Sequence, residues 1–390
     1  MVKARARSTA IRARSGPPTP LELYVKGFED VPLVRGTFVY PSNRSQVDLL
    51  RVDAALDSLP GVRSLRGSRR LPCVVSDQRS RSASPMRALI ADSSAPGRIA
   101  FRDVSEPVPT PGDVLVEVRA FSINRGELKM LGTAADGWRP GWDFAGILRS
   151  DVDGGLRAGS RVVGIRQGGT WAERVAVPRG WIAELSDAIS FAQGAALPTA
   201  GLAALRILRL GPAILGRRVL VTGASGGVGR FAIQLAHLGG ADVTALVSSG
   251  SARAAGLREL GADEVVSDIG QLRGRFDLIL ESVGGETLGR LVTMVDPQGT
   301  LVMFGNSSNE PTTFNVRDVY NDALIRLQGF ELFFGGDPFG RDLGYLVTLV
   351  AERKLDPQLA GELSWEQMPE AMERLRNRDV AGKVALTLGG

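Results

Sequence analysis

The chain has one cysteine, Cys73, and one histidine, His237, in 390 residues. A single cysteine excludes an intramolecular disulfide and fits a reducing compartment, so we expect a cytoplasmic protein. A zinc site of cysteine and histidine ligands needs several such side chains, so metal binding of that kind is not expected. No run of about 18 apolar residues occurs either, which argues against a membrane-spanning helix.

The basic residues are unevenly distributed along the chain. Residues 1–85 contain 15 Lys and Arg against 7 Asp and Glu, which leaves 32 against 35 for residues 86–390. The first segment is rich in Arg, Ser and Pro and predicts a poorly structured extension with one short helix over residues 48–59. We expect the functional protein to start at Met86. Its mildly acidic body argues against a nucleic-acid partner.

Residues 219–229 read Val-Leu-Val-Thr-Gly-Ala-Ser-Gly-Gly-Val-Gly and predict a strand, a glycine turn and the start of a helix. Glycines let backbone N–H groups approach a diphosphate, and a helix start adds partial positive charge. The context favours nucleotide binding over the alternative of a plain structural turn. The predicted cofactor-binding residues of this turn are Gly223, Ala224, Ser225, Gly226, Gly227, Val228 and Gly229.

The rest of the body divides into β-rich and alternating segments. Residues 86–206 contain short alternating strands followed by a helical stretch over 191–210. Between 217 and 305, strands expected at 218–222, 242–247, 263–267, 276–281 and 299–304 alternate with helices expected at 228–238, 251–260 and 285–295. This rhythm is typical of a parallel, doubly wound α/β sheet. The tail has helices expected at 343–353 and 366–377 and a strand from Lys383, and we expect it to complete the β-rich domain.

Several ordered motifs resemble one family, the zinc-free branch of the medium-chain dehydrogenase/reductase superfamily, which includes NADPH:quinone oxidoreductases and enoyl reductases. The motifs are Ser122-Ile-Asn-Arg-Gly-Glu, Gly141-Trp-Asp-Phe-Ala-Gly, Gly169-Thr-Trp-Ala-Glu, Ala196-Leu-Pro-Thr-Ala-Gly-Leu, the glycine turn and Phe304-Gly-Asn-Ser-Ser. The resemblance implies an α/β fold in which a Rossmann domain (207–330) is inserted in a GroES-like catalytic domain (86–206 and 331–390).

The resemblance also bears on zinc. Zinc-dependent relatives have a cysteine ligand where this chain has Asn124, and they have Gly-His-Glu where it has Gly141-Trp142-Asp143. The cysteine-rich structural lobe is missing as well. The comparison therefore implies hydride transfer without a zinc Lewis acid.

The end of the second expected strand of the Rossmann domain bears on the choice of coenzyme. An acidic side chain there would bind the ribose hydroxyls of NAD, but this chain has Ser248, Ser249 and Arg253. Hydroxyls and a guanidinium suit a 2′-phosphate, so we favour NADPH, with NADH use left open. Arg253 also occupies the position of the basic 2′-phosphate residue in relatives. The alternative for Arg253 is a solvated residue in a helical turn, and Asp268 stands where relatives often carry an assisting tyrosine.

The resemblance also implies catalytic residues. Asn124 and Glu127 match the family's Asn-x-x-Asp element, with Glu in place of Asp. The resemblance implies that Asn124 contacts the nicotinamide ribose or the substrate and that Glu127 holds the loop. The alternative is that both residues only form hydrogen bonds within their own loop. Lys129 stands where many relatives have a tyrosine, so it is either a proton donor or a solvated lysine. Thr199 and Trp171 are expected either to line the nicotinamide and substrate cleft or to pack in the core. The backbone of Gly305 and Asn306 is expected beside the carboxamide group of the nicotinamide.

Two functional hypotheses follow. The first is an NADPH-dependent reductase that transfers hydride to a quinone or to the C=C bond of an α,β-unsaturated carbonyl, free or carried as a thioester. The second is a cofactor-binding redox sensor or RNA-binding, crystallin-like protein with little turnover, for which the basic residues 1–85 argue weakly. Relatives commonly dimerise through the nucleotide domain, so a homodimer is among the expected assemblies.

Overall fold

A computed structural model of the chain describes residues 21–22, 35–36, 85–151, 155–248, 254–320 and 324–389. The chain divides into two compact units, Met1–Asp77 and Gln78–Gly390. In the first unit, strands β1 (Leu21–Glu22) and β2 (Arg35–Gly36) pair antiparallel. The helix expected over 48–59 lies outside the described residues.

The second unit contains a seven-stranded, mainly antiparallel sheet in the order β16-β17-β5-β6-β7-β9, with β8 paired to β5. Its strands are β5 (Asp113–Ser122), β6 (Asp143–Leu148), β7 (Arg161–Ile165), β8 (Arg174–Pro178), β9 (Ile182–Glu184), β16 (Leu359–Ser364) and β17 (Lys383–Thr387). β17 pairs antiparallel with β5, with Ala385 opposite Ser122. The C-terminal strand therefore returns to this sheet, as the sequence predicts.

A hairpin and helices cover this sheet and enclose an apolar core. The hairpin is formed by β3 (Pro85–Ala91) and β4 (Ile99–Ser105), and the helices are α2 (Arg125–Thr133) and α9 (Met368–Arg376). Val114, Val116 and Val118 alternate along β5 and are buried, which explains the period of two in the sequence. Short 3-10 helices lie at Pro96–Arg98, Arg179–Trp181, Ile269–Gln271, Val292–Met294 and Trp365–Gln367.

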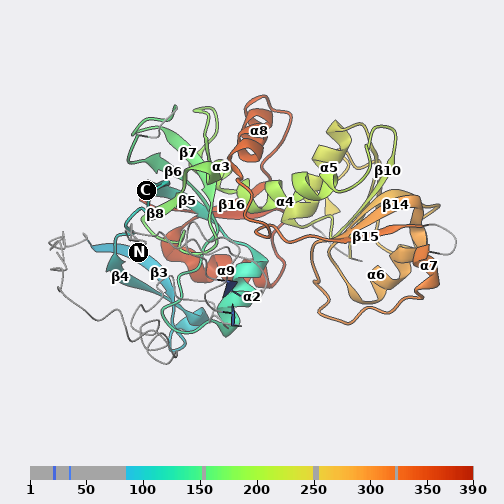
Figure 1. The fold of residues 1–390 in the computed structure, drawn as a ribbon, viewed down its shortest axis with the longest axis horizontal. Coiled ribbons are helices and arrows are strands. Elements are labelled where there is room, and N and C mark those ends of the chain that lie inside the picture. The colour runs from blue at the N-terminus through green and yellow to red at the C-terminus, as the bar shows by residue number, and fades with distance from the viewer. Residues whose placement is uncertain are drawn as a thin grey trace, which may run out of the picture. The chain divides into compact units, whose positions relative to one another are not determined.

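A second, six-stranded sheet is entirely parallel, in the order β12-β11-β10-β13-β14-β15. Its strands are β10 (Arg218–Thr222), β11 (Asp242–Leu246), β12 (Glu264–Val266), β13 (Phe276–Glu281), β14 (Val295–Met303) and β15 (Arg326–Gly329). Helices α5 (Gly227–Leu238) and α6 (Gly285–Leu291) lie on opposite sides of the sheet, and α7 (Arg317–Tyr320) lies near its edge (Figure 1). This is the predicted doubly wound arrangement.

Three details of the sequence prediction need correction. The helix predicted over 285–295 ends at Leu291, and Val295 already opens β14. The helix predicted over 251–260 is wrong for its described part, because 254–260 form turns around Gly256, whose φ is +79°. The helical stretch over 191–210 is two helices, α3 (Phe191–Ala195) and α4 (Pro198–Arg209). Pro198 takes the first position of α4, where its missing N–H is tolerated.

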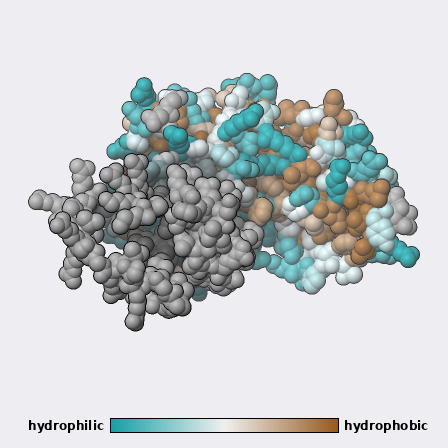
Figure 2. All heavy atoms as spheres, in the orientation of Figure 1, coloured by the Kyte–Doolittle hydropathy of each residue, from teal (hydrophilic) through white to brown (hydrophobic). Residues whose placement is uncertain are grey.

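Helix α4 lies between the two sheets (Figure 1) and packs against α5 and α8 (Gly340–Ala351). Hydrophobic side chains gather on the visible face of the part that holds the parallel sheet (Figure 2). This part contains exposed apolar side chains, among them Leu215, Val316 and Leu324. Within the described residues, no helix is long and apolar enough to cross a membrane.

Candidate active site

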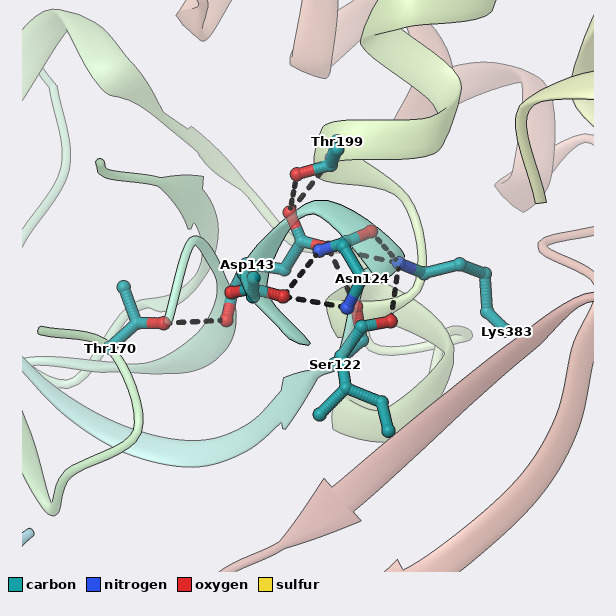
Figure 3. Close-up of polar contacts among 8 residues, drawn as sticks. Ser122, Asn124, Asp143, Thr170, Thr199 and Lys383 are labelled. Atoms are coloured by element: carbon teal, nitrogen blue, oxygen red, sulfur yellow. Dashed lines mark hydrogen bonds and ion pairs between the residues drawn. The ribbon is translucent and has the colours of Figure 1, made fainter. Parts of the chain in front are cut away.

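A fully buried carboxylate, Asp143, organises the polar centre of the second unit (Figure 3). One oxygen, Oδ2, accepts hydrogen bonds from Ser122 Oγ at 2.7 Å, Asn124 Nδ2 at 2.8 Å and Lys383 Nζ at 3.1 Å. The other, Oδ1, accepts from the Thr199 backbone N–H at 2.8 Å and from the Thr199 hydroxyl. Strands β6 and β17, the end of β5 and the start of α4 thus meet at one carboxylate. We call these five residues the Asp143 cluster.

Lys383 brings a cation into this cluster. The side chain opens β17, is 3% exposed, and forms an ion pair with Asp143. Its ammonium donates to Asp143 Oδ2, to Asn124 Oδ1 and to the Ile123 carbonyl, so all three N–H groups are used. A Cβ added at Gly227 would lie 3.2 Å from Lys383 Cδ, which places the lysine stem against the first turn of α5. Lys383 therefore joins the Asp143 cluster to the helix that follows the glycine turn.

Glu127 lies beside the cluster as a buried carboxyl. Its Oε2 accepts from the Asn124 backbone N–H at 2.6 Å and from Asn124 Nδ2 at 3.0 Å, which forms a capping box at the start of α2. Burial, reinforced by the charge of Asp143 and opposed by that of Lys383, raises the pKa of Glu127 to about 8. Its other oxygen, Oε1, is buried without a hydrogen-bond partner. This pKa predicts that Glu127 carries its proton at neutral pH.

The hydrogen bonds of Asn124 and Thr199 limit what each can still bind. Both N–H donors of the Asn124 amide are used by Glu127 and Asp143, and the Thr199 hydroxyl donates to Asp143. Asn124 Oδ1 already accepts from Lys383 Nζ and faces the Glu127 backbone N–H in the capping box. The two side chains thus form a wall without a free donor, in which the Thr199 hydroxyl oxygen keeps the capacity to accept a hydrogen bond from a ligand.

Two other predicted catalytic residues lie apart from the cluster. Lys129 is exposed on α2, and its Nζ donates to Asn309 Oδ1 at 3.0 Å. Trp171 is 1% exposed, and its ring stacks on Phe121 with ring centroids 5.9 Å apart. The position of Trp171 is thus that of a core side chain, the packing alternative of the sequence analysis, because almost no ring surface is open to a ligand.

The glycine turn runs from the end of β10 into α5 and has the shape that a diphosphate requires. Gly223 has φ +57°, and a Cβ there would lie 2.6 Å from Ser282 Oγ. A Cβ at Gly229 would lie 2.6 Å from Gly223 O and 2.7 Å from Ala224 Cα. The N-cap of α5, Gly226, provides no side-chain cap, so the first N–H groups of the helix stay free for an anion. These residues fit a dinucleotide.

The other predicted cofactor contacts are described only in part. Ser248 is exposed just after β11, whereas Ser249 and Arg253 lie outside the described residues. A Cβ at Gly305 would lie 3.1 Å from Ser282 Cβ, so this glycine allows two strand ends to approach each other. Asn306 Oδ1 accepts from Ser308 Oγ and from the Asn309 N–H, both at 3.1 Å.

Three charged side chains of the candidate site were not predicted from the sequence: Asp143 as an organising carboxylate, Lys383 and Glu281. Glu281 ends β13 beside β10, where the strand order reverses, and holds the Val283 N–H at 2.7 Å and the Gly284 N–H. Burial raises its pKa. In each case the sequence signal is a charged residue at the first or last position of a mostly apolar strand.

Comparisons with known proteins agree with this geometry. The profile of a family described as zinc-binding dehydrogenase matches residues 260–386. The chloroplastic quinone-oxidoreductase QR1 of Triphysaria versicolor is 28% identical over 338 residues, which cover 77% of this chain and 98% of that protein. The solved quinone oxidoreductase of Coxiella burnetii is 26% identical, covers 78% of this chain and 100% of that one, and gives a TM-score of 0.66. The chain belongs to the medium-chain dehydrogenase/reductase superfamily.

Within this superfamily the chain is quinone oxidoreductase-like, and it is an oxidoreductase. The spectinabilin polyketide synthase protein NorB of Streptomyces orinoci is 32% identical over 297 residues, but the chain spans only 13% of that protein. A mycobacterial protein solved in complex with NADPH is 21% identical, with a TM-score of 0.68 and 78% of this chain covered, and shares the fold.

Because the matching family is described as zinc-binding, we asked whether the side chains of the candidate site could bind zinc. Among the described residues, no group of three His, Cys, Asp or Glu side chains is placed to hold a metal ion. The oxygens of Asp143 and Asn124 instead surround the ammonium of Lys383. A divalent cation bound to the same oxygens would meet a fixed positive charge at close range, so these residues do not fit zinc.

Proposed function

We propose that the protein is a zinc-independent, NADPH-dependent reductase that transfers hydride to a quinone or to the C=C bond of an α,β-unsaturated carbonyl. One observation carries the proposal: the Lys383 stem packs on the helix that follows the glycine turn, while its ammonium fills the centre of the Asp143 cluster. Lys383 thereby links the proposed nucleotide site to the Asp143 cluster, and its ammonium takes the place that a metal cation would need.

Bound NADPH would supply the hydride, and the residues of this chain would position the reaction. The turn from Gly223 to Gly229 would hold the diphosphate with backbone N–H groups. Asn124 and Thr199 would line the nicotinamide ribose, and the Thr199 hydroxyl oxygen would accept a hydrogen bond from it, because the Thr199 proton is already donated to Asp143. Lys383 would keep both side chains in place through Asp143 and Asn124.

The same wall provides no donor for the oxygen of a reduced acceptor. Stabilisation of an enolate-like or quinol oxygen would therefore come from outside the Asp143 cluster. Lys129 is the proposed proton donor. Its exposed ammonium contacts Asn309, in the same turn as Asn306, which is expected beside the nicotinamide. The thioester acceptors of enoyl reductases remain within the same reaction class.

NADPH is preferred over NADH in this proposal because no carboxylate follows β11. Ser248 occupies the strand end, and Arg253 is proposed to bind the 2′-phosphate. A homodimer and a cytoplasmic location remain predictions, together with the view that small molecules are the substrates.

The decisive test follows NADPH and NADH consumption by the full chain with 1,4-benzoquinone, 3-penten-2-one and a crotonyl thioester. We expect NADPH turnover with at least one acceptor. A protein that binds NADPH without consuming it in the presence of all three would support the alternative of a cofactor-binding sensor. Steeply salt-dependent RNA binding by the full chain would favour the RNA-binding form of that alternative.

The coenzyme preference has its own test. We expect Arg253→Ala to weaken NADPH binding far more than NADH binding, because only NADPH carries the 2′-phosphate. Arg258→Ala is the control, since the Arg258 guanidinium already donates to the Asp263 carbonyl. Equal losses for the two coenzymes would remove Arg253 from the phosphate site.

A further inference from the structure

Two arginines lie on neighbouring loops that lead into the Asp143 cluster. Arg139 precedes β6 and Arg166 follows β7. The backbone N–H of Arg166 donates to the Trp142 carbonyl at 2.8 Å, and the backbone N–H of Gly169 donates to the Arg139 carbonyl at 2.9 Å. A Cβ added at Gly169 would lie 3.3 Å from Arg166 Nη1. The Arg166 guanidinium therefore lies against the turn that the Arg139 backbone holds.

Within the part of the chain that the structure describes, neither guanidinium forms a hydrogen bond or an ion pair, and Arg139 Nε is buried without an acceptor. Burial lowers the pKa of both arginines, and the charge of Arg166 lowers the pKa of Arg139 further, while Asp113 raises that of Arg166. Partly buried cations of like charge are unfavourable unless an anion binds them.

Trp142 connects this pair to the candidate active site. Its carbonyl receives the Arg166 N–H, and its ring lies over Gly126, where an added Cβ would be 2.6 Å from Trp142 Cη2. Gly126 immediately precedes Glu127, and Asp143 immediately follows Trp142. Trp142 thus links the loops that carry the two arginines to Gly126 and Asp143, next to the residues that are proposed to position the coenzyme.

We propose that Arg139 and Arg166 bind an anionic group of the acceptor substrate, a carboxylate or a phosphate. Guanidinium groups bind both through paired N–H donors. The inference rests on the proposed function and narrows it: the acceptor is an enone, quinone or enoyl thioester that carries negative charge. Carboxylate and phosphate probes distinguish the two kinds of anionic group.

Ligand-free stability gives the first test, and it does not depend on catalysis. If the arginines are held ready for an absent anion, Arg139→Gln and Arg166→Gln remove an unfavourable charge and raise the melting temperature of the apo protein. In thermal-shift titrations, 4-oxopentanoate or pantetheine 4′-phosphate should stabilise the wild type and the control Arg376→Gln, an exposed residue of α9, but not the two variants. Lower melting temperatures for both variants, with unchanged responses to both probes, would show a structural role and overturn the proposal.

Kinetics gives the second test with matched acceptors. The ratio of kcat/KM for 4-oxopent-2-enoate to that for neutral 3-penten-2-one should fall by roughly tenfold or more in each variant if the substrate is a carboxylate. The ratio for crotonyl thioesters of phosphopantetheine and pantetheine should fall instead if it is a phosphate. Unchanged ratios for both pairs would refute the anion site even though the reductase is active. Absence of turnover with every acceptor would refute the proposed function, and the thermal-shift titrations would then decide the anion site alone.

Discussion

The buried carboxyl of Glu127 predicts an unusual dependence of stability on pH. Its pKa is raised from 4.5 to about 8, so between these values the folded protein keeps a proton that the unfolded chain has released. The contribution of Glu127 to stability therefore falls as pH rises through this window and levels off above about 8. Each pH unit corresponds to about 1.4 kcal/mol, so the wild type should lose on the order of 2.5 kcal/mol from this group between pH 5.5 and 7.5.

Glu127→Gln isolates this effect because its neutral amide resembles the protonated carboxyl. Urea unfolding of both proteins at pH 5.5, 6.5 and 7.5 should show the stability of the variant rising relative to wild type by about 2 to 3 kcal/mol across the range. Glu362→Gln, an exposed glutamate of β16, is the matched control. If wild type and Glu127→Gln have parallel pH dependence, Glu127 does not hold a proton in the folded state and the electrostatic account of the Asp143 cluster is wrong.

Three further substitutions test other parts of the account. Lys383→Met leaves the buried Asp143 carboxylate without its cation and should lower the free energy of unfolding by about 3 to 5 kcal/mol, measured with urea; a loss below about 1 kcal/mol would contradict the ion pair. Gly229→Ala should weaken NADPH binding about tenfold or more in fluorescence titrations, because its Cβ would force the helix away from the turn, whereas Gly132→Ala, with open space around its Cβ, should have no such effect. Trp171→Ala should reduce stability by about 3 to 5 kcal/mol, as expected for a core ring; a changed KM without lost stability would return Trp171 to the cleft.

The fold was predictable because its signals are local. Period-two patterns such as Val114, Val116 and Val118 identify strands one at a time, and the glycine turn identifies the first unit of the parallel sheet. β15 was not predicted, because Arg326-Leu-Gln-Gly329 is short and does not alternate. The helix expected over 251–260 fails in its described part because Gly256 adopts a left-handed conformation that periodicity cannot reveal.

The candidate site was predictable only in part, because its centre depends on tertiary contacts. Asn124, Glu127 and Thr199 were named from motifs, and all three lie at or beside Asp143. Lys383 stands 240 positions from Asp143, and the two meet because β5 pairs with both β17 and β6. The sequence also shows nothing of the hydrogen bonds that Asn124 makes within the protein, which leave its amide without a free donor for a ligand.

The central claim is that hydride passes from NADPH to its acceptor with Lys383, and no metal, as the cation of the site. The most direct measurement is NADPH-dependent reduction of the best acceptor before and after exhaustive dialysis against a chelator, with the zinc content of the same samples determined by atomic emission. We predict undiminished turnover at a zinc content far below one ion per chain. Activity that disappears with the metal and returns in proportion to added zinc would contradict the account.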